Sequence, residues 1–455
     1  MSTGARTNDA DTGVNINDLL DASPWSLPQK LILALLSLAY LTDGIANQSL
    51  GLAIPALMQD WGLPREAFAS VAAVGLLGLT IGAVIGGMLG DRFGRRTMMI
   101  ASTGFFGLMT MAQAWSTSPG ELMVLRFLDG IGIGAMIPNG AAMISEFTAR
   151  RERALALAIG MTFIAVGAMI SGLIGNLIIV PHGWQGLFIA LGGIAVAAAL
   201  LLLLLLPESP IYLANHGASP ARLRALARRC GIALDERPIV ANPPDAASTH
   251  RSPVSVLFTA DVASSTIFLW IAFFFCLLAN YAMFSWVPAM LAGLGFALSY
   301  TSLGMTALSF GGLVGGMGSG WLIKAFGSRG TVLGLAGGGV VMALMLGLLI
   351  RAQVNSLGVV LTMLAVIGFF TAGLLNGLYT FSAFIYPDRA RGTGIGAAAA
   401  AGRVGAIASA YAGVAALSIG GASGYFLLIA GSLALSLACV AFIRKQIPAA
   451  SGEAG

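Results

Sequence analysis

Long apolar stretches alternate with short polar ones along almost the whole chain. A helix needs roughly 20 apolar residues to cross the hydrocarbon core of a bilayer. Six stretches of this kind occupy residues 30–56, 68–90, 97–115, 121–145, 154–180 and 185–206, and six more occupy residues 264–292, 300–323, 330–350, 356–385, 392–418 and 423–443. The pattern predicts an all-α membrane protein with twelve transmembrane helices in two six-helix bundles, 30–206 and 264–443.

The composition agrees with a membrane protein. The chain is 57% hydrophobic and 9% charged, whereas soluble domains carry roughly a quarter charged residues. The three cysteines have no metal-ligand spacing, so no metal site or cofactor is predicted. His182, His216 and His250 all fall in predicted loops, and no catalytic set of side chains is evident, so we do not expect an enzyme.

The basic residues set the orientation. With the N-terminus inside, the cytoplasmic loops and tail contain Arg92, Arg95 and Arg96, Arg150, Arg151 and Arg153, Lys324 and Arg329, Arg389 and Arg391, and Arg444 and Lys445. The opposite side keeps only Arg65 and Arg351. Because cytoplasmic loops carry an excess of Lys and Arg, residues 1–29 and 444–455 are predicted to be cytoplasmic tails. The net charge of +5 follows this pattern, so no nucleic-acid partner is expected.

The polar interval 207–263 is predicted to be a cytoplasmic linker. It contains Arg222, Arg224, Arg228 and Arg229, which indicates a short basic amphipathic helix on the membrane surface followed by a loose connection. A regulatory binding segment is the alternative.

An internal repeat divides the chain into two halves. Residues 87–96 and 320–329 align at a constant offset, which superimposes Gly87, Phe93, Gly94 and Arg96 on Gly320, Phe326, Gly327 and Arg329. Two like halves suit a transporter in which one bundle moves against the other.

The first copy of this repeat fits the pattern G-x3-D-[RK]-x-G-[RK]-[RK] at every position, with Gly87, Asp91, Arg92, Gly94, Arg95 and Arg96. In this loop the chain resembles the major facilitator superfamily. The resemblance implies the major facilitator fold and a charge-relay latch in which Asp91 pairs with Arg95. Further candidates for cytoplasmic gate pairs are Glu146 with Arg150 and Arg153, and Asp388 with Arg389 and Arg391. Solvated loop charges are the alternative for these pairs.

Further segments resemble the aromatic acid/proton symporters of that superfamily. They are 126–134 with Pro138 and Asn139, 207–210, 285–288, 386–387, 391–396 and 402–405. The first span of that family carries a D-G-x-D pair. In this chain Asp43 matches the first acid, and Ala46 stands where the second is expected.

Four ionisable residues lie inside predicted spans: Asp43, Arg126, Asp129 and Arg403. Such residues usually face a cavity and have a function. Asp43 lies near mid-membrane, where desolvation disfavours a charged carboxylate, so it is the first candidate for carrying a coupling proton. A paired structural acid is the alternative.

Arg126 and Asp129 are three residues apart on one helical face, so they are expected to pair with each other. The competing hypothesis is that Asp129 supplies the second carboxylate missing at Ala46. Protonation would then free Arg126 to meet an anion.

Arg403 is the predicted anchor for a substrate carboxylate, because a guanidinium offers two parallel hydrogen bonds. A structural partner for a backbone carbonyl or for Asp43 is the alternative. An aromatic ligand also needs flat apolar walls and a few polar groups. The candidates are Asn47, Gln48, Asn139, Tyr281, Trp286, Asn376 and Tyr379, and ordinary helix packing is the alternative for each.

The leading interpretation is a monomeric, multi-pass inner-membrane transporter that imports a small aromatic carboxylate, such as a hydroxylated benzoate, together with protons. A porter for a sugar, polyol or drug is one alternative, and a transporter-derived membrane receptor is another. The expected partners are the aromatic acid, protons and the lipid bilayer.

Overall fold

The computed structural model describes residues 14–15, 20–21, 25–216, 218–229, 239–240, 257–259, 262–354, 356–386 and 391–443. Asp388 and the predicted C-terminal tail lie outside these ranges. Most of the described residues are helical, and the only strands among them are β1 (Val14–Asn15) and β2 (Ile239–Val240), which pair in parallel. The fold is therefore all-helical in character, as the apolar pattern predicts.

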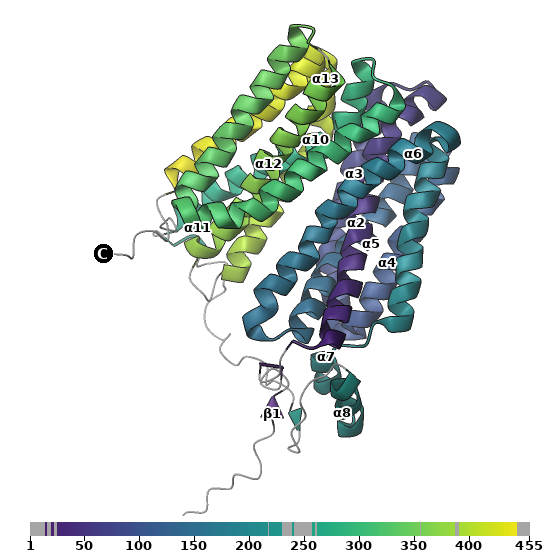
Figure 1. Ribbon diagram of the computed structural model, residues 1–455, viewed down its shortest axis with the longest axis vertical. Coiled ribbons are helices and arrows are strands. Elements are labelled where there is room, and N and C mark those ends of the chain that lie inside the picture. Colours follow the sequence, from purple (N-terminus) through teal and green to yellow (C-terminus); the bar gives the residue numbers. More distant parts are fainter. Residues whose placement is uncertain are drawn as a thin grey trace, which may run out of the picture.

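The helices form two bundles with a linker between them (Figure 1). The N bundle contains α2 (Leu27–Trp61), η1 (Arg65–Phe68), α3 (Ala69–Phe93), α4 (Arg95–Ala112), η2 (Gln113–Trp115), α5 (Pro119–Phe147) and α6 (Arg150–Leu205). The C bundle contains α10 (Ala263–Gly293), α11 (Leu298–Arg351), α12 (Leu357–Ile385) and α13 (Arg391–Phe442). The linker contributes the short helices α7 (Pro210–Asn215) and α8 (Pro220–Arg229).

Within the described residues, seven helical segments are long and apolar enough to cross a membrane. They are α2, η1 with α3, α6, α10, α11, residues 357–382 of α12, and α13. Three of these, α6, α11 and α13, have 56, 54 and 52 residues. Helices of that length extend roughly 80 Å, which is more than twice the thickness of the hydrocarbon core.

A glycine with positive φ interrupts each of these three helices. Gly183, Gly327 and Gly421 have φ of 65°, 74° and 58°, a backbone region that residues with a side chain rarely adopt. Each long helix therefore consists of two helical segments that meet at a kink. The three glycines lie in the short gaps that the apolar pattern leaves between predicted spans.

The packing of the helices defines two bundles and the interface between them. In the N bundle α2 packs on α6 and α3 on α5, and in the C bundle α10 packs on α13 and α11 on α12. The bundles meet where α6 contacts α11, α3 contacts α13 and α2 contacts α10. Gly51 of α2 lies against the carbonyl of Phe284 in α10, so a side chain at position 51 would hold these helices apart.

Candidate functional site

Asp43 lies near the middle of α2, and its side chain is only 2% exposed. Its carboxylate forms no hydrogen bond or ion pair with any residue that the structure describes. Two charges act on it, one from Asp129 on α5 and one from Arg403 on α13. Asp43 therefore interacts with an acid of its own bundle and with a base of the opposite bundle.

Arg403 is half-buried on α13. Within the described part of the chain, its guanidinium has no hydrogen bond or ion pair. Tyr281 of α10 and Tyr379 of α12 both lie within electrostatic range of it. Tyr379 in turn packs edge-on against Phe273, with ring centroids 5.0 Å apart. Arg403 is thus a cation among aromatic rings with unused donors.

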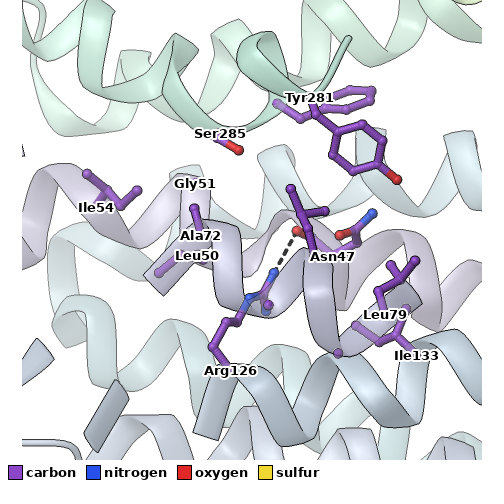
Figure 2. Close-up of a pocket in the computed structure, with 14 residues that line it drawn as sticks. Asn47, Leu50, Gly51, Ile54, Ala72, Leu79, Arg126, Ile133, Tyr281 and Ser285 are labelled. Atoms are coloured by element: carbon purple, nitrogen blue, oxygen red, sulfur yellow. Dashed lines mark hydrogen bonds between the residues drawn. The ribbon is translucent and has the colours of Figure 1, made fainter. Parts of the chain in front are cut away.

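Asn47 connects this cluster to the N bundle. It lies one helical turn after Asp43 on α2, and it lines the same pocket as Tyr281 of α10. Figure 2 shows Asn47 between Tyr281 and Arg126 in a small pocket, with Ser285 nearby. The pocket is lined by α2, α3 and α5 of one bundle and by α10 of the other, so it lies at the interface between the bundles.

Arg126 donates to four acceptors through its two Nη groups. Its Nη1 donates to Asp129 Oδ2 at 2.6 Å, to Ser49 Oγ at 3.1 Å and to the Ala46 carbonyl at 3.4 Å, and its Nη2 donates to the Asn47 carbonyl at 3.0 Å. Arg126 therefore joins α5 to α2 at Ala46, Asn47 and Ser49, and both of its Nη groups are engaged.

Asp129 is completely buried and is also well satisfied. Besides Arg126, it accepts hydrogen bonds from Thr110 Oγ1 at 3.0 Å and from Gln113 Nε2 at 3.2 Å. Sequence reasoning missed Thr110, Gln113 and Ser49. Two polar residues three apart in the third apolar stretch were the available signal for Thr110 and Gln113, because that spacing places them on one helical face.

The repeat loop between α3 and α4 contains an ionic cluster. Arg95 pairs with Asp91 and approaches Glu146 of α5, with Nε–Oε1 at 3.5 Å. Arg150, which the sequence assigns to Glu146, instead lies 3.5 Å from Asp21, measured from Nε to Oδ2. The Nε atom of Arg153 is buried without a hydrogen-bond partner in the described residues. Glu146 is therefore held by the repeat loop rather than by its sequence neighbours.

The other predicted gating residues have varied surroundings. Arg92 lies over the Phe93 ring, 5.3 Å from its centroid. Gly87 faces open space, and Gly94 has a φ of 99° at the start of α4. Arg391 is exposed at the start of α13.

Four predicted ligand residues have surroundings that are easily described. Asn139 donates to the Gly86 carbonyl at 2.8 Å and so joins α5 to α3. Trp286 is fully buried against α13. Gln48 is buried and its Oε1 has no hydrogen-bond partner in the described residues, while Asn376 is exposed on α12. None of these has a described hydrogen bond to Arg403.

Hydrogen bonds between the bundles occur near the start of α3. Ser418 of α13 donates to Glu66, and the Tyr411 hydroxyl donates to Ser70 Oγ at 3.3 Å. The repeat loop with Asp91 lies at the other end of α3. Two hydrogen bonds therefore join the bundles at the end of α3 that lies away from this loop, and a third runs from Thr306 of α11 to the Met169 carbonyl of α6 at 3.3 Å. The sequence carried no signal for these contacts.

Comparisons with known proteins agree on one family. A sequence model of the Major Facilitator Superfamily matches residues 36–355 and 269–454. A gallate transporter of Pseudomonas putida is 32% identical over 413 residues, which is 90% of this chain and 90% of that protein. A 4-hydroxybenzoate transporter of the same organism is 29% identical and covers 91% and 92%. A 3-(3-hydroxy-phenyl)propionate transporter of Escherichia coli is 29% identical and covers 85% and 87%.

The fold is similar to solved structures at lower identity. A bacterial homolog of the human lysosomal transporter Spinster, in an inward-facing and unoccupied conformation, superimposes with a TM-score of 0.67. It is 16% identical and covers 92% of this chain and 96% of that chain. At this identity the similarity concerns the fold alone.

The Arg126–Asp129 pair predicts a specific loss of stability. Asp129→Asn leaves a buried guanidinium without its counter-charge, a change that destabilises proteins by about 3–5 kcal/mol. Thr110→Val is the matched control, because it removes one neutral donor to the same carboxylate, worth about 1 kcal/mol. We expect thermal unfolding in detergent to begin at a clearly lower temperature in Asp129→Asn than in Thr110→Val. Equal melting temperatures would show that the charge of Asp129 does not stabilise the buried guanidinium of Arg126.

Proposed function

The chain belongs to the Major Facilitator Superfamily, a family of transporters rather than enzymes, and from this premise we propose that it imports a small aromatic carboxylate together with protons across the inner membrane. Its curated relatives carry gallate, 4-hydroxybenzoate and a hydroxyphenylpropionate. A hydroxylated benzoate is the proposed substrate. The observation that carries the proposal is the guanidinium of Arg403, which has no hydrogen bond or ion pair among the described residues and lies among tyrosines within reach of the Asp43 charge.

The substrate carboxylate binds the guanidinium of Arg403. A guanidinium donates two parallel hydrogen bonds to a carboxylate, and the donors of Arg403 are not used by the described residues. Tyr281 and Tyr379 offer ring faces for the substrate ring and hydroxyl groups for its phenolic substituents. Asn47 and Trp286 remain secondary candidates, because the Asn47 carbonyl already accepts a hydrogen bond from Arg126 and Trp286 is buried by packing.

Asp43 carries the coupling proton. With Asp43 ionised, its charge and that of Arg403 cancel across the bundle interface. Binding one proton to Asp43 and one carboxylate to Arg403 leaves the loaded site neutral as well. A site that holds only one of the two carries a net charge, which is unfavourable inside a bilayer. Proton and substrate therefore bind together, and only the empty and the fully loaded site reorient easily.

Asp129 is the second candidate for proton binding. It already accepts hydrogen bonds from Arg126, Thr110 and Gln113, so its protonation would have to break the Arg126 pair. Arg126 would then be free to bind an anion in the pocket beside Asn47. The Arg126–Asp129 pair has no net charge, so it leaves the charge balance of Asp43 and Arg403 unchanged. We therefore assign the main role in proton binding to Asp43.

The architecture follows the same proposal. Each of α6, α11 and α13 crosses the membrane twice, once on each side of its kink. With α2, α3, α4, α5, α10 and α12 this gives twelve crossings and places both termini in the cytoplasm. A monomer is then the complete unit. The repeat loop, with Asp91, Arg95 and Glu146, then lies on the cytoplasmic side. It acts as a latch between two orientations of the bundles, while the contacts of Glu66 and Ser70 close the outer side.

Two alternatives are separated by one experiment. A porter for sugars, polyols or drugs would carry neutral solutes, and a transporter-derived receptor would bind an aromatic acid without moving it. We propose counterflow in proteoliposomes with a panel of benzoates, cinnamates, biaryl acids and sugars. Exchange of hydroxylated benzoates supports the proposal. Exchange of sugars alone supports the first alternative, and binding without exchange supports the receptor.

Arg403→Lys is expected to weaken transport of hydroxylated benzoates about ten- to a hundredfold. Lysine keeps the charge but loses the paired geometry, and each hydrogen bond to a charged group is worth about 1.5–3 kcal/mol. The measurement is the concentration for half-maximal counterflow of 4-hydroxybenzoate. Arg351→Lys is the control, because Arg351 is an exposed arginine at the end of α11. If both variants transport like the parent protein, Arg403 does not bind the carboxylate.

Asp43→Asn is expected to abolish accumulation driven by a pH gradient and to leave counterflow intact. Asparagine resembles the protonated acid, so the substrate still binds but no proton is released. Asp60→Asn serves as the control on the same helix, because Asp60 accepts a hydrogen bond from Trp184 at the end of α2. If uptake driven by a pH gradient survives in Asp43→Asn, the coupling proton binds to Asp129 and not to Asp43.

A further inference from the structure

A second cavity lies at the end of the N bundle that carries the linker. It has a volume of about 780 Å³, which is within the range of ligand sites in proteins. Its walls come from the first half of α2, the end of α6, the start of α4, and α7 and α8. Figure 1 shows α7 and α8 at this end of the bundle, next to the beginning of α2.

The walls of this groove are mostly aliphatic. They include Leu31, Leu35 and Leu38 of α2, Leu204 and Leu205 of α6, and Leu226 of α8. Leu31, Leu204 and Leu205 are 58%, 79% and 57% exposed. Such exposed leucines on a membrane-spanning bundle face lipid acyl chains, so the apolar part of the groove is continuous with the lateral surface of the bundle.

Helix α8 forms the other side of the groove, and its packing determines which of its arginines line the groove. Leu223 and Leu226 are only 6% and 8% exposed and pack against the end of the N bundle. Their spacing places Arg222 and Arg228 on the exposed side of the helix. Arg222 lines the groove, whereas Arg228 does not. The guanidinium of Arg222 has no hydrogen bond or ion pair among the described residues.

Arg96 provides a second fixed cation in the groove. Its Nε donates to the Leu206 carbonyl at 2.6 Å and its Nη2 to the Leu203 carbonyl at 2.7 Å. These bonds hold the guanidinium at the end of α6, and among the described residues it forms no ion pair with an acidic side chain. Glu208 also lines the groove. Its Oε1 accepts the backbone N–H groups of Arg96 at 3.0 Å and of Ser209 at 2.9 Å, which commits that oxygen to the backbone.

We propose that this groove binds an anionic phospholipid. The acyl chains lie along the leucines of α2 and α6, which are open to the bilayer, and the phosphate lies between Arg222 and Arg96. A peptide would need polar groups for its backbone, and the groove offers apolar walls with only Arg96, Arg222 and Glu208 as charged groups. The bound lipid holds α8, and with it the linker, against the N bundle.

The test is native mass spectrometry of the purified full-length transporter with palmitoyl-oleoyl-phosphatidylglycerol as the probe. An arginine near a membrane surface contributes about 1 kcal/mol to binding an anionic lipid. Arg222→Gln is therefore expected to lower the affinity about fivefold. Arg228→Gln, which removes the same charge from the same helix outside the groove, is expected to leave it unchanged. Ala225→Trp fills the groove and is expected to reduce binding of any phospholipid.

Three outcomes overturn the proposal. An equal loss in Arg222→Gln and Arg228→Gln means that the lipid responds to the general charge of α8. Full binding in Ala225→Trp means that the acyl chains lie elsewhere. Competition by inorganic phosphate as effective as that by phosphatidylglycerol means that the site binds a free anion. Thermal unfolding of each variant, measured without added lipid, identifies any variant that fails to fold.

Discussion

Charged side chains that lie inside a membrane, where there is little water, impose the main constraint on this structure. A charged side chain inside a membrane must find partners or face a cavity, and the two arginines in mid-helix meet this requirement differently. Arg126 donates to Asp129, Ser49 and the backbone of α2, so it belongs to the architecture of the N bundle. Arg403 has no hydrogen bond to the described residues and lies beside Tyr281 and Tyr379. Its unused donors are the reason for placing anion recognition in the C bundle.

Because Asp43 and Arg403 belong to different bundles, occupancy of the site alters the attraction between the bundles. Allosteric coupling requires two states and a difference in contacts between them. In this transporter the proposed difference is electrostatic. An ionised Asp43 attracts Arg403 across the interface. When a proton binds to Asp43 and the substrate carboxylate binds to Arg403, that attraction is lost. The hydrogen bonds of Glu66 and Ser70 near the start of α3, and the Asp91–Arg95–Glu146 cluster at its other end, provide contacts that such a change can open or close.

Much of the fold was predictable, because a bilayer imposes long apolar helices and glycine marks the turns between them. The gap predicted between 323 and 330 contains Gly327, and the gap between 418 and 423 contains Gly421. The pairing of Arg126 with Asp129 was also predictable, because both lie on one helical face. Partners from other helices were not. Spacing suggested that Glu146 pairs with Arg150, but Glu146 lies beside Arg95 and Arg150 beside Asp21, because tertiary packing decides between nearby charges. Tyr281 and Asn47 meet across the bundles, which no local pattern encodes.

The proposed coupling requires that one proton and one carboxylate bind a site that is neutral when empty and neutral when full. Uptake of 4-hydroxybenzoate into proteoliposomes, with the membrane potential clamped by potassium and valinomycin, tests this charge balance. A neutral cycle predicts that a gradient of one pH unit gives about tenfold accumulation and that an inside-negative potential of about 100 mV gives none. A second proton per substrate would make each cycle carry one positive charge inward. Accumulation of about fiftyfold at that potential without a pH gradient would contradict the neutral cycle.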